Sequence, residues 1–206
     1  MSSSAVTASR LTYDARTALV VVDLQNDFAD PAGGLHVAGG EDLAGLLAPE
    51  VEAARSAGAL VVFTQDWHPA RTPHFDTDGG PWPVHCVAGT WGAQLVPGLD
   101  VRDSDPVVRK GADGQDGYSG FSVRDTVTGD VSGTALQGVL DAHGARRVVV
   151  VGLAGDVCVA ATALDAVRLG YETVLPVALT RFVEREAGDG DRTQQQLREA
   201  VVTVLP

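Results

Sequence analysis

One of the two cysteines in this 206-residue chain has the surroundings of a nucleophile. Cys158 lies in the segment VVGLAGDVCVAAT (150–162), where an apolar run breaks at Gly152 and restarts as a helix. A thiol near a helix N-terminus lies close to the positive end of the helix dipole, which favours the reactive thiolate. The apolar residues that follow fit a small core residue equally well. Position alone therefore leaves catalysis and packing equally open.

Two charged residues, Asp23 and Lys110, strengthen the catalytic interpretation. Asp23 ends the apolar run TALVVVD (17–23), and Lys110 ends DPVVRK (105–110). A carboxylate at the end of a buried strand is costly unless it is paired or used, and a lysine is its natural partner. The pair could be a structural salt bridge, or it could remove the thiol proton and favour the thiolate.

A group of metal-type ligands falls in the segments TQDWHPARTPHF (64–75) and GPWPVHC (80–86). They supply one carboxylate and three of the chain's five histidines: Asp66, His68, His74 and His85. Such a set suits one divalent transition metal ion, with Zn²⁺ preferred and Mn²⁺ or Fe²⁺ also compatible. The alternative is a set of unrelated loop histidines. Cys86 is interpreted as a packing residue.

The elements that must position these residues follow from the pattern of apolar runs. Long helical or loop segments separate the runs, which are rich in valine and lack alternation, as in strands buried on both faces. They predict six strands, at 17–23, 59–66, 105–110, 146–154, 171–179 and 200–205, and helices at 40–58, 134–144, 156–170 and 190–201. We expect an α/β fold, a three-layer α/β/α sandwich with a six-stranded, mainly parallel, doubly wound sheet.

The carboxyl ends of these strands are where the candidate residues lie. Open α/β sheets bind ligands at that edge, so an acid, a base, a thiol and metal-type ligands would meet there. Residues 67–104 contain no strand-like run and are too long for a simple connection, which is typical of a functional loop. We expect one domain over 16–206, and a disordered, serine-rich tail over 1–15.

Composition limits the classes of partner and location. The net charge of −12 and the absence of a basic cluster argue against nucleic acid or anionic lipid as a partner. No run approaches the roughly 18 to 20 apolar residues of a membrane span. The first residues lack the apolar segment of a secretory signal, so we expect a cytoplasmic protein with reduced thiols.

Five motifs, in order along the chain, resemble the cysteine hydrolases of the isochorismatase-like superfamily, and most closely its nicotinamidase and pyrazinamidase branch. They are VVVDLQNDF, TQDWHP, GPWPVHCVAGTWGAQLVPGL, RKGADGQDGYSGF and VVVVGLAGDVCVAAT. The resemblance extends from about Ala18 to Thr180. Beyond Thr180 the chain diverges from the family pattern, and Gly155 stands where the pattern usually has a threonine.

The resemblance implies a role for each matching position. The catalytic triad would be Asp23, Lys110 and Cys158, with the backbone amides of Ala154 and Cys158 binding the oxyanion after a cis Leu153–Ala154 peptide. The metal ligands would be Asp66, His68 and His85, with His74 where some members add a fourth. The aromatic pocket walls would be Phe28, Trp82 and Tyr118.

The implied activity is hydrolysis of nicotinamide, or a related aromatic carboxamide, to the acid and ammonia through a thioester on Cys158. Isochorismatases proper lack the cysteine and the metal ligands, and carbamoyl-amine hydrolases lack the metal set. Two alternatives stay open: a hydrolase of larger or cyclic amides, similar to streptothricin hydrolase, and a non-catalytic ligand-binding protein. Relatives of this kind often form dimers or tetramers, so a homo-oligomer is expected.

Overall fold

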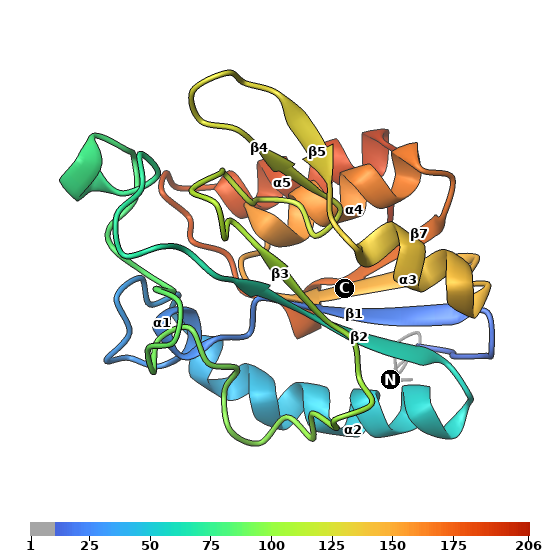
Figure 1. The fold of residues 1–206 in the computed structure, drawn as a ribbon. Helices are drawn as coiled ribbons and strands as arrows, with labels where there is room; N and C mark the ends of the chain where they lie inside the picture. Colours follow the sequence, from blue (N-terminus) through green and yellow to red (C-terminus); the bar gives the residue numbers. More distant parts are fainter. Residues whose placement is uncertain (1–10) are drawn as a thin grey trace, which may run out of the picture.

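The computed structural model describes residues 11–206, and its centre is a parallel sheet of six strands in the order β3-β2-β1-β6-β7-β8 (Figure 1). All five neighbouring pairs are parallel, which confirms the predicted sheet. The strands are β1 (Thr17–Val22), β2 (Leu60–Asp66), β3 (Val107–Lys110), β6 (Arg147–Gly152), β7 (Glu172–Pro176) and β8 (Thr203–Leu205).

Helices cover both faces of the sheet, which explains the uninterrupted apolar runs. The six residues of β1 are all buried; Leu19 and Val21 face the layer of α2 (Leu43–Ser56), whereas Ala18, Val20 and Val22 face the opposite layer. That second layer holds α3 (Leu136–His143), α4 (Cys158–Arg168) and α5 (Asp189–Glu199) (Figure 1). Both faces of such a strand are buried, so its sequence does not alternate between apolar and polar residues.

The order of the strands places a topological switch point between β1 and β6. From β1 the chain moves outward through β2 and β3, then returns to β6 on the other side of β1. Connections leaving β1 and β6 therefore run in opposite directions and leave a crevice at their carboxyl ends. The short helix α1 (Asn26–Ala29) begins at this edge, immediately after β1 (Figure 1).

Helix α2 lies within the predicted helix over 40–58 and runs through Pro49, although proline usually opens or breaks a helix. The missing N–H removes one hydrogen bond, but burial of Leu43, Leu47, Val51 and Ala54 holds the helix on the sheet. A hairpin of β4 (Ser122–Arg124) and β5 (Val131–Gly133) forms in a segment to which the sequence pattern assigned no strand.

The predicted disordered tail, 1–15, lies mostly outside the described residues. Within its described end, Leu11 and Tyr13 pack against the core, and the Tyr13 hydroxyl donates a hydrogen bond of 2.9 Å to Glu50. Between residues 11 and 206, no helix is long and apolar enough to cross a lipid bilayer.

Candidate active site

A buried lysine joins the ends of three neighbouring strands. The Nζ atom of Lys110, at the end of β3, lies 2.6 Å from Oδ2 of Asp23 and 2.5 Å from Oδ1 of Asp66. The same ammonium donates to the carbonyl of Gly117 and lies 3.8 Å from Sγ of Cys158. The side chains of Lys110 and Asp23 are wholly inaccessible to solvent. The structure thus brings together the three predicted catalytic residues, although they lie far apart in the sequence.

The charges in this cluster determine its protonation. Burial lowers the pKa of Lys110, but the charges of Asp23 and Asp66 outweigh burial and raise that pKa well above its usual range. Burial raises the pKa of Asp66, but Lys110 and then His68 lower it well below the usual range. Lys110 is therefore an ammonium and Asp66 a carboxylate at neutral pH.

The Asp23 carboxyl is suited to accept and return a proton near neutral pH. Burial raises the pKa of Asp23 to about 6. The charge of Lys110 and a 2.6 Å hydrogen bond from the Thr64 hydroxyl to Oδ1 both act to lower this pKa. Asp23 has φ of 45°, a left-handed conformation that is uncommon for a residue other than glycine. The Asp23 N–H bonds the Thr64 oxygen at 3.1 Å, which helps to hold this conformation.

Cys158 is the first residue of α4 and follows a sharp turn from β6. The Leu153–Ala154 peptide is cis, as the resemblance implied, and the Ala154 carbonyl accepts hydrogen bonds from the N–H groups of Val157 and Val159. The first N–H groups of a helix have no partner within the helix, so the amide of Cys158 is available to an anion. Burial raises the pKa of the Cys158 thiol well above its usual range, against the lowering effect of Lys110. At neutral pH the thiol is therefore protonated and needs a base.

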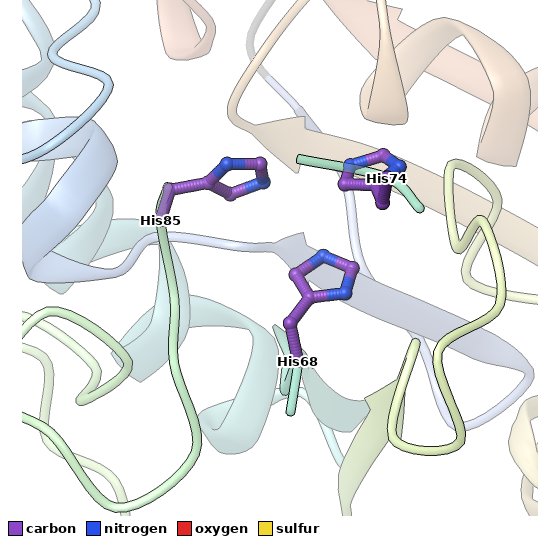
Figure 2. Close-up of side chains that lie close together, drawn as sticks. All are labelled: His68, His74 and His85. Carbon is purple, nitrogen blue, oxygen red and sulfur yellow. The ribbon is translucent and has the colours of Figure 1, made fainter. Parts of the chain in front are cut away.

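The three loop histidines converge on one space beside this cluster (Figure 2). One ring nitrogen from each of His68, His74 and His85 lies within 4.8 Å of the others. Oδ2 of Asp66 is 3.8 Å from Nε2 of His68 and 3.9 Å from Nε2 of His85. The structure thus groups the three predicted histidines, including His74, whose membership the resemblance left open, and places Asp66 beside two of them.

Hydrogen bonds outside the group orient two of its rings. Nδ1 of His74 lies 2.6 Å from Oδ1 of Asp116, and Nδ1 of His85 lies 2.7 Å from the Pro83 carbonyl. Both bonds leave Nε2 free for a metal ion, which is the usual arrangement around bound metals. The sequence reasoning missed Asp116; its place two residues before Tyr118, inside a quoted motif, was the available signal.

The protonation of these side chains fits a divalent cation. Both ring nitrogens of the buried His68 lack a hydrogen-bond partner in the described chain. Burial lowers the pKa of His85 to about 4 and also lowers the pKa of His74, so both are neutral ligands at neutral pH. Asp23 and Asp66 carry two negative charges when ionised, and Lys110 neutralises one of them. A bound metal ion would compensate the remaining negative charge.

A pocket that is open to solvent lies over Cys158 between the two clusters. All three predicted aromatic walls line it, and Nε1 of Trp82 donates a hydrogen bond of 2.9 Å to the Tyr118 hydroxyl. Ala154 and two of the histidines, His74 and His85, also border the cavity. Sequence reasoning missed four aliphatic wall residues, which no motif distinguishes from core residues: Leu35, Val37, Val157 and Val183.

Comparisons with known proteins agree with this geometry. The isochorismatase domain model matches residues 17–203. The nicotinamidase/pyrazinamidase of Mycobacterium tuberculosis is 41% identical over 174 residues, covering 82% of this chain and 88% of that protein. The crystal structure of PnC1 from L. infantum in complex with nicotinate superposes with a TM-score of 0.84 at 40% identity, covering 95% of each chain. The pyrazinamidase of Pyrococcus horikoshii in complex with zinc gives 0.82 at 33% identity, covering 92% of this chain and 98% of that one.

Proposed function

We propose that this chain, which belongs to the isochorismatase family, hydrolyses nicotinamide to nicotinate and ammonia. The observation that carries the proposal is the position of Cys158 at the base of an aromatic-lined cavity, with the buried Lys110–Asp23 pair behind it and the metal-type ligands beside it. Such a site offers a nucleophile, a base and a binding pocket for a flat heteroaromatic amide.

In the proposed first step, Asp23 accepts the thiol proton as the sulfur of Cys158 attacks the carboxamide carbon. The carbonyl electron pair moves to oxygen, and the resulting oxyanion accepts hydrogen bonds from the amides of Ala154 and Cys158. The C–N bond then breaks, and the proton held by Asp23 goes to the leaving nitrogen. The products of this half-reaction are ammonia and a thioester on Cys158.

Water completes the cycle with the same base. Asp23 accepts a proton from water while the water oxygen attacks the thioester carbon. The C–S bond then breaks, and the proton held by Asp23 returns to the Cys158 sulfur. The pKa of about 6 allows Asp23 to accept and release protons in the range where the enzyme would work. Lys110 remains an ammonium throughout and stabilises negative charge on the sulfur, 3.8 Å away.

We further propose that Asp66, His68, His74 and His85 bind one Zn²⁺ ion, because a carboxylate with neutral imidazoles is a preferred set for that metal. When bound, the ion would supply an electrophilic site that orients the ring of the substrate. The cavity beside this set is bounded by Phe28, Trp82 and Tyr118, which favours a small planar amide over a larger lactam. We expect the protein to act on this small molecule in the cytoplasm, as a homo-oligomer.

Ammonia release from nicotinamide tests the proposed function. The purified protein is assayed as isolated, after removal of metal by a chelator, and after Zn²⁺ is restored. We expect turnover that falls on chelation and returns with the metal. Cleavage of a bulky lactam without cleavage of nicotinamide would contradict the proposed substrate, and ligand binding without any hydrolysis would contradict the proposed chemistry.

Replacing Thr64 by valine is expected to move the acid limb of the kcat/KM profile to higher pH. Below a pH of about 6, Asp23 becomes protonated and cannot accept the thiol proton, so the rate falls. The Thr64 hydroxyl lowers the pKa of Asp23 through its hydrogen bond, and valine removes that bond. The limb should shift upward by about one pH unit, since a hydrogen bond to a charged group contributes about 1.5 kcal/mol.

Thr64→Ser is the matched control, because serine keeps the hydroxyl and should leave the limb where it is in the wild type. An acid limb that stays in place or moves to lower pH in Thr64→Val would contradict the assignment of Asp23 as the base.

A further inference from the structure

Residues 181–185, which we call the strap, are attached to the turn that precedes Cys158. The N–H of Gly155 donates a hydrogen bond of 2.7 Å to the Arg181 carbonyl. The Asp156 carboxylate accepts bonds of 2.9 Å from the N–H groups of Val183 and Glu184. Glu184 has φ of 50°, and the bond to Asp156 holds it in this left-handed conformation. The strap is thus fixed to the turn through its backbone.

The Phe182 side chain provides the second attachment. A Cβ atom built on Gly155 would lie 2.7 to 2.9 Å from three atoms of the Phe182 ring, and one built on Gly190 would lie 3.2 Å from it. The ring therefore occupies the space beside two glycines. Gly155 does not have a positive φ, so its backbone conformation would allow another residue. Glycine is required there because the Phe182 ring occupies the space of a side chain.

Two other strap residues lie at the substrate cavity or against one of its walls. Val183 lines the cavity, as do Cys158 and Trp82. The guanidinium of Arg185 lies 5.1 Å from the centre of the Trp82 ring, which is cation–π contact distance. Arg185 forms no ion pair within 4.0 Å among residues 11–206, so this ring is the partner that the structure shows for its charge. The strap thus supplies one wall residue, Val183, and contacts a second wall residue, Trp82, through Arg185.

We propose that the strap is the specificity-determining wall of the cavity, that Val183 limits the size of the ring that fits, and that Phe182 is the positioning residue that holds the strap against Gly155. The proposal rests on the proposed function, because it assigns the size limit of the same nicotinamide site. An aliphatic side chain pressed against the ring position excludes a fused or substituted ring by steric overlap, and its truncation removes that overlap.

The first test compares nicotinamide with quinoline-3-carboxamide, which carries the same pyridine carboxamide on a fused ring. In Val183→Ala, the ratio of kcat/KM for the larger amide to that for nicotinamide should rise by about tenfold or more, and the KM for nicotinamide should rise with little change in kcat. A ratio that stays at the wild-type value in an active Val183→Ala enzyme would overturn the strap proposal alone. A wild type inactive on nicotinamide would overturn the proposed function and the strap with it.

The second test is a double-mutant cycle between Gly155 and Phe182. Gly155→Ala should displace the ring and change the same specificity ratio, whereas adding Gly155→Ala to Phe182→Ala should change it little further, because the obstructing ring is gone. The matched control is Gly138→Ala on α3, where an added Cβ meets no atom within 4 Å. Additive effects in the cycle, or a Gly155→Ala enzyme with reduced kcat and an unchanged ratio, would overturn the role of Phe182.

Discussion

Cys158→Ala is expected to abolish ammonia release from nicotinamide, with a fall in kcat of about 10⁴-fold or more. The substitution removes the sulfur that forms the thioester, and no other thiol or hydroxyl of the described chain is in the same position to replace it. Cys158 lies in the cavity wall, so alanine leaves the pocket and the Lys110–Asp23 pair in place. Steady-state ammonia release, with nicotinate binding measured in parallel, checks the result.

Cys86→Ala is the matched control for this prediction. Both thiols are free and buried, and burial raises the pKa of each well above its usual range. Cys86 packs in the core on the α2 side of the sheet, so its loss should lower the free energy of unfolding by about 1 kcal/mol and leave kcat within a few fold. Wild-type turnover in Cys158→Ala, or a loss as large in Cys86→Ala, would exclude the covalent mechanism.

The meeting of the candidate residues at one edge could be predicted from the sequence, because the positions of three of them follow from the fold class. Asp23, Asp66 and Lys110 each lie at or just after the end of an apolar run, and parallel strands bring such positions to one edge. The contact of Lys110 with Asp66 was not predicted, because it depends on register. Asp66 and Lys110 are direct Cα partners across β2 and β3, a pairing that the pattern of the separate strands does not determine.

Other parts of the site depend on loops whose conformation no local pattern determines. Asp116 orients His74 from a segment that pairs with Arg124 through two backbone hydrogen bonds of 2.8 Å. Val183 reaches the cavity, and Phe182 reaches the turn at Gly155, from the region beyond Thr180, where the motif resemblance ends. The departure at Gly155 could be recognised in the sequence, but its physical reason required the position of the Phe182 ring.

Lys110→Met is expected to reduce both stability and turnover. Methionine approximates the length of the lysine side chain but leaves the buried carboxylates of Asp23 and Asp66 without their shared cation. Breaking a buried ion pair by removing one partner costs about 3 to 5 kcal/mol of the free energy of unfolding. Loss of the lysine charge also raises the pKa of Asp23, which becomes protonated at neutral pH, so kcat should fall about 10³-fold or more.

Denaturant unfolding and ammonia release separate these two effects when Lys110→Met is combined with Asp23→Asn. In the wild type, the Asp23 carboxylate lies 2.6 Å from the Lys110 ammonium. The double variant lacks both charges, so much of the lost stability should return while activity stays absent. Recovery of stability would show that Lys110 neutralises Asp23 in the folded state, whereas activity stays absent because the double variant lacks the base. An additive loss of stability in the double variant would show instead that the lysine acts through Asp66, the other carboxylate that its ammonium contacts.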